Sequence, residues 1–500
     1  MAMDVVIRVD ASIAIGSGHV MRCLTLADEI RALGGSVHFL CRHLTDFLRL
    51  HILATGHRLT MLPLQPSDAG GDLPHSRWLG VSQKQDAQDS LAALQGGPCW
   101  LVVDHYGLDA RWETELAPHT GCILAIDDLA DRFHQCQALL DQNLRQDGDT
   151  AYDGKLPPES RRLVGPRYAL LRPEFRAPGQ VQGMGSPPRL NLFFGSTDPL
   201  GMTLTALEAL RGMDVAVDVI AGADNPHREA IAALCQTMPQ ASLHVQPRDF
   251  AAILGRADLA LGAGGSTSWE RCCLGLPTLI VSVANNQSSG TKALARAGAA
   301  IDLGEAGSVS SQRIADAVGE LLSNPERLAA MRAAAKALVD GRGAERVALY
   351  MMRDQVRLRA AVMDDAEPKW QWRNDERTRR YSRDSRPVDL ARHLNWWQGS
   401  LGSDTRMLLI AHYGCVDVGV LRFDIEHHLA TVSVYLDPDM TGLGLGPAIL
   451  RAGTIWLHAQ HPGVRDVLAE IDENNVASAA SFARAGFHKD TNQLWKWTLP

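Results

Sequence analysis

Several features that would place this chain in other classes of protein are missing from its sequence. No apolar segment approaches the roughly 20 residues that are needed to span a bilayer. Long runs of Lys and Arg are also absent, and the net charge of −8 argues against a nucleic-acid partner. The first residues lead directly into an apolar stretch, without the basic and hydrophobic regions of a signal peptide. We therefore expect a cytoplasmic protein with neither a membrane nor a nucleic acid as its partner.

Paired cysteine spacings are lacking as well. The nine cysteines are scattered along the chain, and none of them forms a CxxC pair; Cys272 and Cys273 are adjacent. This usage is typical of reduced thiols in a bacterial-type cytoplasm, so we expect no metal site. With 500 residues the chain is too long for one core, and two or three domains are expected.

A glycine-rich turn, GSGHVMR, occupies residues 16–22. It follows an apolar run at 5–7, which predicts a buried strand, and it precedes residues with apolar positions at helical spacing. Unpaired N–H groups and the helix dipole at such a strand-to-helix turn favour a phosphate or another anion. His19 falls in the first turn of the helix, where the same field favours the neutral imidazole that a general base needs. An ordinary turn with a capping histidine would give the same pattern.

Strands and helices alternate after this turn, which predicts an open parallel sheet with helices on both faces. In such sheets ligands bind at the carboxyl ends of the strands. The polar residues expected at these ends are Asp10, Asp104, His105, Tyr106, Asp127 and Asp128. Each of them alone could be a turn residue, but their shared location favours a functional interpretation of the group.

A second strand and helix series begins near residue 190, after a linker rich in Gly, Pro, Ser and Gln at 177–188. It contains another glycine-rich turn that opens a helix, and a polar loop after the next strand. The candidate ligand-binding residues of this half are Gly264, Gly265, Ser266, Thr267, Glu270, Asn286 and Gln287. Glycine-rich loops in both halves predict a cleft that holds a nucleotide diphosphate and the group that reacts.

Together the motifs at 16–24, 127–128, 264–266 and 286–287 resemble those of the UDP-sugar hydrolases of pseudaminic acid biosynthesis, over roughly residues 4–350. The resemblance implies two Rossmann-like lobes of a GT-B-type glycosyltransferase fold. It also implies inverting hydrolysis of UDP-2,4-diacetamido-2,4,6-trideoxy-β-L-altropyranose, in which His19 activates the water and no metal takes part. The residues that would then contact the UDP-sugar are Asp10, Gly16, Ser17, Gly18, Arg22, Tyr106, Asp128, Gly264, Gly265, Ser266, Thr267, Glu270, Asn286 and Gln287.

The composition changes after an acidic, proline-containing break at 363–368, and tryptophans gather between residues 370 and 397. Three strands are predicted between 408 and 436, followed by a glycine-rich loop at 441–447 that opens a helix. The pattern is completed by a further strand at 467–471, the segment NVAS at 475–478 and the GF pair at 486–487, which ends a short helix.

This order of elements resembles the GNAT acetyltransferases, and the segment 372–397 is similar to the nucleotide-sugar N-acetyltransferases among them. The resemblance implies an α/β domain that uses acetyl-CoA as co-substrate. The residues that would bind acetyl-CoA are Leu436, Gly442, Leu443, Gly444, Leu445, Gly446, Asn475 and Ser478. Two departures weaken the match: Thr441 stands where Arg or Gln is usual, and Phe482 stands where many members carry a Tyr that protonates the thiolate. An inactive, degenerate acetyltransferase domain therefore stays open.

We expect four segments: an N-terminal lobe with the catalytic histidine at 1–180, a UDP-binding lobe at 181–350, a linker at 351–367 and the acetyltransferase domain at 368–500. The sequence favours a fused N-acetyltransferase and UDP-sugar hydrolase that act in consecutive steps. A UDP-sugar-dependent glycosyltransferase and a catalytically silent nucleotide-sugar sensor are the alternatives. The oligomeric state is not indicated by the sequence.

Overall fold

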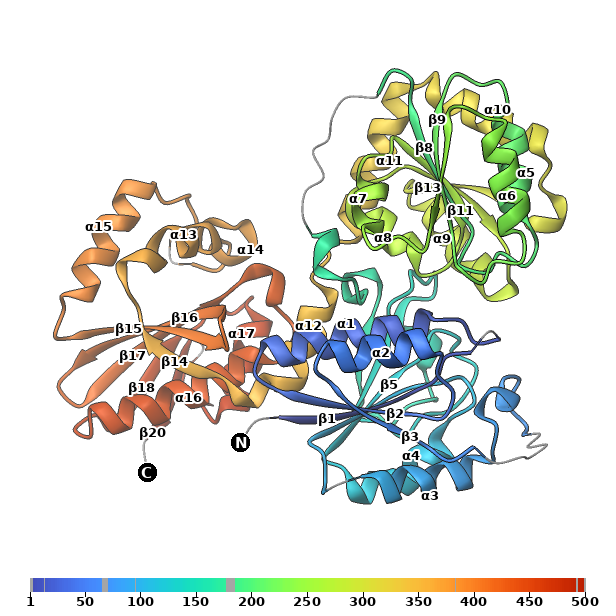
Figure 1. The fold of residues 1–500 in the computed structure, drawn as a ribbon. Coiled ribbons are helices and arrows are strands. Elements are labelled where there is room, and N and C mark those ends of the chain that lie inside the picture. Colours follow the sequence, from blue (N-terminus) through green and yellow to red (C-terminus); the bar gives the residue numbers. More distant parts are fainter. Residues whose placement is uncertain are drawn as a thin grey trace. The chain divides into compact units, whose positions relative to one another are not determined.

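The computed structural model describes residues 3–12, 14–64, 71–94, 96–176, 185–382, 384–491 and 493–498. The first part of the predicted linker at 177–188 lies outside these residues. The chain forms two compact units, a larger one built from Met3–Glu29 and Ser36–Glu345 and a smaller one built mainly from Arg346–Pro500. Figure 1 labels many of the elements of both units.

The first sheet of the larger unit has seven parallel strands in the order β3-β2-β1-β4-β5-β6-β7. The strands are β1 (Asp4–Val9), β2 (Ser36–Cys41), β3 (Arg58–Met61), β4 (Trp100–Asp104), β5 (Cys122–Ile126), β6 (Ala138–Asp141) and β7 (Arg161–Val164). Its helices are α1 (Gly18–Ala32), α2 (Asp46–Ala54), α3 (Gln83–Ala93) and α4 (Ala110–Leu116). The central strands β1, β4 and β5 are almost entirely buried, as their continuous apolar runs require in a sheet covered on both faces.

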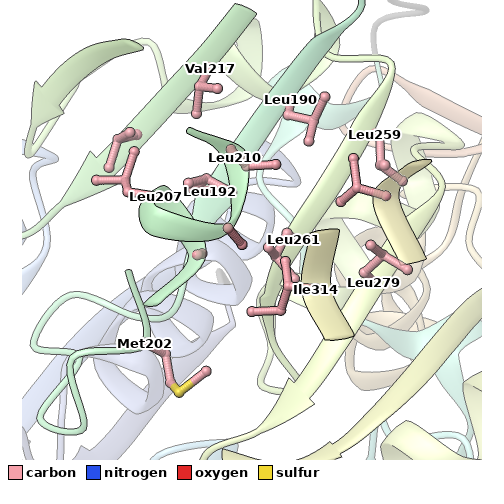
Figure 2. Close-up of a cluster of buried hydrophobic side chains, with 14 of the residues drawn as sticks. Leu190, Leu192, Met202, Leu207, Leu210, Val217, Leu259, Leu261, Leu279 and Ile314 are labelled. Carbon is pink, nitrogen blue, oxygen red and sulfur yellow. The ribbon is translucent and has the colours of Figure 1, made fainter. Parts of the chain in front are cut away.

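The second sheet has six parallel strands in the order β10-β9-β8-β11-β12-β13. The strands are β8 (Arg189–Phe193), β9 (Ala216–Ala221), β10 (Ala241–Val245), β11 (Leu259–Ala263), β12 (Thr278–Ser282) and β13 (Ala300–Glu305). The helices that follow are α5 (Met202–Leu210), α6 (Arg228–Gln236), α7 (Phe250–Gly255), α8 (Thr267–Leu274), α9 (Ser288–Arg296), α10 (Ser311–Leu322), α11 (Pro325–Leu338) and α12 (Gly343–Met352). Figure 2 shows the core of this lobe, where leucines of β8 and β11 pack against Leu207 and Leu210 of α5.

Both sheets reverse their strand order at one point, between β1 and β4 in the first and between β8 and β11 in the second. At such a switch point the loops after adjacent strands turn to opposite faces of the sheet and leave a crevice for ligands. Both predicted glycine-rich turns follow strands at these points, namely β1 and β11. The parallel sheets predicted from the alternating pattern are confirmed.

The smaller unit contains a third sheet in the order β14-β15-β16-β17-β18-β20-β19. Its strands are β14 (Arg357–Ala360), β15 (Arg406–Tyr413), β16 (Val416–Glu426), β17 (Leu429–Leu436), β18 (Asp466–Glu470), β19 (His488–Lys489) and β20 (Leu494–Thr498). Its helices are α13 (Ala366–Asn374), α14 (Glu376–Arg379), α15 (Leu390–Leu401), α16 (Leu445–Gln460) and α17 (Val476–Ala485). Neighbouring strands are antiparallel except for β17 and β18, which are parallel.

The segment 351–367, which we predicted as a linker, contains a strand of this third sheet. β14 pairs with β15 in an antiparallel ladder from Arg357 to Ala360. Arg359 also forms ion pairs with Asp365, at 2.7 Å, and with Asp417 of β16. The sheet hydrogen bonds and these ion pairs tie the segment to the smaller unit, so its structured part begins earlier than the sequence indicated. Within the residues that the structure describes, no helix is both long and apolar enough to cross a membrane.

Candidate active site

His19 lies where the first glycine-rich turn enters α1. Gly16 has a φ of 81°, a conformation that residues with a Cβ rarely adopt, so the sharp turn after β1 depends on glycine there. α1 begins at Gly18, and the N–H of Met21 already donates to the carbonyl of Ser17. His19 is therefore in the first helical turn, as the sequence predicted.

A carboxylate at the end of the neighbouring strand holds the imidazole. Oδ1 of Asp104, the last residue of β4, lies 2.7 Å from Nδ1 of His19. Arg22, one turn further along α1, donates from Nε and Nη2 to the two oxygens of the same carboxylate, each over 2.6 Å. The Asp104 side chain is fully buried, whereas the His19 side chain is 12% exposed. The imidazole is thus anchored on its inner side and open on its outer side.

Charge decides which nitrogen of His19 carries the proton. Burial by itself would raise the pKa of Asp104, but Arg22 and His19 outweigh this effect and hold that pKa well below the usual carboxyl range. Because an ionised carboxylate only accepts hydrogen bonds, Nδ1 of the neutral imidazole carries the proton and donates it to Asp104. Nε2 is left with a lone pair, which is what a general base uses.

A second acid and a tyrosine complete the cluster around His19. Nη1 of Arg22 lies 3.1 Å from Oδ2 of Asp128, and the hydroxyl of Tyr106 donates to the other oxygen of that carboxylate. Burial, reinforced by Asp128, raises the pKa of Tyr106 far above its usual value, so Tyr106 stays a neutral donor. Its ring packs edge-on against the imidazole, with centroids 4.7 Å apart and an interplanar angle of 86°. These contacts leave the imidazole a single orientation.

A cavity of about 170 Å³ opens beside this cluster, and loops of both lobes line it. The predicted site residues that line it are Gly18, His19, Arg22, Tyr106, Asp128, Gly264, Gly265, Ser266, Asn286 and Gln287. A Cβ on Gly18 would lie 4.0 Å from Oγ of Ser266, so the two glycine-rich turns face each other at close range. Gly16 and Ser17 lie in the chain between two residues of this lining, Ile15 and Gly18, and do not belong to it themselves.

Asp10 was also expected at the substrate, but the structure places it in the protein interior. Its side chain is fully buried and accepts hydrogen bonds from the guanidinium of Arg8 and from the main-chain N–H groups of Arg42 and His43. Burial alone would raise the pKa of Asp10, but Arg8 outweighs this and lowers it to about 2. With its oxygens occupied in this way, Asp10 organises the sheet edge instead of lining the cavity.

The second glycine-rich turn leads from β11 into α8, whose first residue is Thr267. Gly264 lies close to its neighbours, because a Cβ there would come within 2.3 Å of Oγ1 of Thr291. Thr267 and Glu270 follow Ser266 in the first turn of α8 and are not among the residues that line the cavity. Burial raises the pKa of Glu270 to about 7, and Arg172, whose Nη2 is 4.0 Å away, opposes that rise. Glu270 is therefore a carboxyl that changes its charge near neutral pH.

Sequence reasoning missed several residues of the site. Asp104 was recognised as the end of a strand, but its contact with His19 was not foreseen. Ile15, Leu129, Gln142 and Asn143 also line the cavity. The last two follow β6, so their place at a strand's carboxyl end was the available signal. Among the residues described by the structure, no group of three or more His, Cys, Asp or Glu side chains could hold a metal ion.

In the smaller unit, the parallel strands β17 and β18 separate after three paired positions. Leu429, Ala430 and Thr431 pair with residues 466–468, whereas β17 continues to Leu436 and β18 to Glu470 without further pairing to each other. The two strands therefore diverge toward their carboxyl ends, and the ladder between them ends at Thr431 and Leu468. Leu436, predicted to bind the cofactor, lies at this opening.

The predicted glycine-rich loop of this unit precedes α16 directly. Gly442 and Gly444 have φ values of 80° and 78°, which turn the chain sharply into the helix N-terminus. The side chains of Leu443 and Leu445 are 1% exposed and Gly446 is buried, so these positions offer only main-chain groups to a ligand. This arrangement fits a pyrophosphate cradle.

Asn475 and Ser478 form the N-terminus of α17, where Oδ1 of Asn475 accepts the N–H of Ser478 over 3.0 Å. The two positions that depart from the acetyltransferase pattern have local packing roles. Thr441 donates its hydroxyl to the carbonyl of Pro438, and Phe482 is 3% exposed and packs edge-on against Phe487. Phe482 therefore belongs to the hydrophobic interior of this unit.

Two parallel-stranded lobes around a histidine-containing cavity, followed by a mixed α/β unit with a glycine-rich loop, define the architecture. The comparisons agree with it. Residues 355–488 match the model of the acetyltransferase (GNAT) domain family. The expected fold class, two Rossmann-like lobes of GT-B type followed by an α/β GNAT domain, is confirmed.

Relatives of the larger unit are found among sugar-metabolising proteins. The chain is 29% identical over 193 residues to the spore coat polysaccharide biosynthesis protein SpsG of Bacillus subtilis, a match that covers 38% of this chain and 57% of that protein. The chain thus spans little more than half the length of that relative. It is also 23% identical over 299 residues to the UDP-2,4-diacetamido-2,4,6-trideoxy-β-L-altropyranose hydrolase of Campylobacter jejuni, covering 59% of this chain and 97% of that enzyme. The resemblance drawn from the motifs is therefore confirmed as a similarity of sequence.

Among solved structures, the MurG protein of Acinetobacter baumannii aligns with 71% of this chain and with all of its own chain. Its TM-score is 0.48, and the two sequences are 14% identical.

Proposed function

We propose that the chain is a bifunctional enzyme of nonulosonate biosynthesis, with two activities on successive UDP-sugars of one pathway. The larger unit would hydrolyse UDP-2,4-diacetamido-2,4,6-trideoxy-β-L-altropyranose, with inversion at the anomeric carbon, to UDP and the free sugar. The GNAT domain would transfer an acetyl group from acetyl-CoA to the amine of the UDP-4-amino sugar that precedes it, as in the pseudaminic acid pathway. The observation that carries the proposal is the His19–Asp104 pair, set in a cavity that the glycine-rich loop of the second lobe also lines.

The hydrolytic step follows from the orientation of His19. With Nδ1 held by Asp104, Nε2 takes a proton from a water molecule as the water oxygen bonds to the anomeric carbon. The bond from that carbon to the diphosphate oxygen breaks on the opposite side, and UDP departs with the electron pair. Main-chain N–H groups at 264–266 and the N-terminus of α8 stabilise the charge that develops on the diphosphate. UDP is a good leaving group, so positioning of the water and one general base can suffice.

In the GNAT domain, the loop at 442–446 would hold the pyrophosphate of acetyl-CoA, and the diverging strands β17 and β18 would hold its acyl end. The amine nitrogen would then bond to the acetyl carbonyl carbon and pass a proton to solvent, and the C–S bond would break as the CoA thiolate leaves. Phe482 has no hydroxyl to protonate that thiolate, so solvent supplies the proton.

One experiment separates the proposal from the alternatives. The full chain is incubated with the diacetamido UDP-sugar and no acceptor, and UDP, the free sugar and its anomeric configuration are followed by NMR. Steady release of UDP with the inverted anomer supports hydrolysis. Turnover only after addition of a sugar or lipid acceptor would indicate a glycosyltransferase. Thermal stabilisation by the UDP-sugar without turnover would indicate a sensor.

Acetyl transfer is tested separately with the UDP-4-amino sugar and acetyl-CoA. Formation of free CoA, together with an acetylated product identified by mass spectrometry, supports the second activity. The absence of both products would mean that the domain is degenerate.

A further inference from the structure

Two glutamines of the cavity have carboxamides whose orientation is fixed by the main chain. Oε1 of Gln142, which follows β6, accepts the N–H of Leu170 over 3.2 Å. Oε1 of Gln287, on the opposite lobe, accepts the N–H of Val283 over 3.1 Å. A main-chain N–H pairs only with the oxygen of a carboxamide, so the NH₂ group of each glutamine points away from this contact.

Gln142 is a donor without a protein acceptor. It is 4% exposed and lines the cavity. Among the residues that the structure describes, no acceptor is found for its Nε2. Because Gln142 lines the cavity, its Nε2 can donate to a water or a ligand there. Gln142 is therefore prepared for an acceptor atom inside the cavity.

The loop that carries Gln142 is held firmly. Asp141, fully buried at the end of β6, accepts the N–H of Asn143 over 2.8 Å and the hydroxyl of Tyr152 over 3.0 Å. With its carboxamide pinned to Leu170 as well, Gln142 has little freedom to move its NH₂ group toward another partner. A donor in a fixed position discriminates between ligands better than a mobile one.

The surroundings of Gln142 fit an acyl group. The cavity wall on this lobe contains the apolar side chains of Leu129 and Ile15 as well as the N–H donor of Gln142. The carboxylate of Asp128 accepts one hydrogen bond on each oxygen, from Arg22 and from Tyr106, and the Arg22 guanidinium offsets its charge. A carbonyl with an attached methyl group matches the Gln142 donor and these apolar side chains, whereas an ammonium at the same place would meet the NH₂ group of Gln142, donor against donor.

We propose that Gln142 is a specificity-determining residue, which donates a hydrogen bond to an N-acyl carbonyl of the sugar and so selects acylated amino sugars over those with a free amine. This inference rests on the proposed hydrolase function. It implies that the acyl group must be attached before the hydrolase site can act. The GNAT domain must then act before the hydrolase site, and the UDP-sugar with a free amine is not hydrolysed before it has been acetylated.

The test measures UDP release by the full chain, without acetyl-CoA, from two substrates: the diacetamido UDP-sugar and the same UDP-sugar with a free 4-amino group. Gln142→Glu keeps an oxygen for the N–H of Leu170 but replaces the NH₂ donor by a carboxylate oxygen. We expect kcat/KM for the acylated sugar to fall about 10- to 100-fold, mainly through KM, because one hydrogen bond is lost and a carbonyl meets a carboxylate. The value for the amine should rise, so the preference inverts.

Gln142→Met serves as a second variant of similar size without charge, and should lose the preference without inverting it. Gln236→Glu, at the exposed end of α6, is the matched control and should change neither value. An unchanged ratio of the two substrates in both Gln142 variants, with normal wild-type hydrolysis, would overturn this inference alone. A wild-type chain that releases no UDP from either sugar would overturn the hydrolase function, and the inference with it.

Discussion

Replacement of His19 by asparagine tests the central element of the hydrolase site. The shorter amide can still donate to Asp104, as Nδ1 does over 2.7 Å, but it offers nothing at the position of Nε2. The general base is thereby removed, while its anchor to Asp104 is retained. Such a base accounts for about 10²- to 10⁴-fold in rate, or about 3–5 kcal/mol of activation free energy.

The cost to stability is smaller and can be estimated from the same contacts. His19→Asn loses the edge-on packing against Tyr106, which is worth about 0.5–1.5 kcal/mol. For a unit of this size, that loss lowers the melting temperature by only a few degrees. We therefore expect a folded variant that binds UDP normally by calorimetry and loses most of its UDP release.

The control is His119→Asn, an exposed histidine that precedes β5 at the amino-terminal edge of the same sheet. It should leave both UDP release and melting temperature unchanged. If His19→Asn retains UDP release within about threefold of the wild type, the assignment of His19 as the general base is refuted. A variant that also loses UDP affinity would show instead that His19 serves to bind the substrate.

Three further predictions concern other residues. Asp104→Asn leaves the buried Arg22 without its main partner and should lower the free energy of unfolding by about 3 kcal/mol at pH 7 in urea denaturation. The pKa of Asp104 is lowered in the folded state, so the stabilisation that its carboxylate provides is present above the ordinary carboxyl pKa and is lost as the pH falls below it. If the variant and the wild type were equally sensitive to acid below pH ~4, this prediction would be contradicted. Burial raises the pKa of Glu270 to about 7, so the free energy of unfolding should fall as the pH rises from about 4.5 to 7. Glu270→Gln should therefore raise the melting temperature at pH 8 but not at pH 4. Equal melting temperatures of variant and wild type at pH 8 would contradict this prediction. Gly444→Val forces a branched side chain into a φ of 78° at the start of α16. The variant should lose acetyl transfer at least 10-fold, with UDP release unchanged. Equal losses in both activities would show that the substitution has unfolded the protein and has not acted on the loop alone.

Local pattern was sufficient to predict most of the architecture. Continuous apolar runs such as that of β1 can be satisfied only in a sheet covered on both faces, and the glycines at 16–18 and 264–265 leave little choice but a tight turn into a helix. His19 could therefore be placed in the first turn of α1 before any long-range contact was known. The same reasoning found the loop before α16, because periodicity and turn chemistry depend on neighbouring residues only.

Where the sequence was insufficient, the information lay in contacts between distant residues. The predicted linker at 351–367 was read as a break in composition, but its strand β14 is defined by hydrogen bonds to β15, some 50 residues later. The glutamine that follows β6 could be placed at a strand's carboxyl end from the sequence, but the direction of its carboxamide is set by the N–H of Leu170, which no local pattern indicates.

The sequence by itself determined where most of the buried strands lie, where the chain turns sharply into helices, and that polar side chains gather at the carboxyl ends of the strands. Only the tertiary structure decided which of those side chains meet. Asp10 and Asp104 both end or follow a buried strand, yet Arg8 holds Asp10 in the interior, whereas Asp104 binds His19, 85 residues away in the chain. The reason is that a strand's own residues fix its burial and length, while the partner of a side chain at its end depends on the strand order and on what packs beside it.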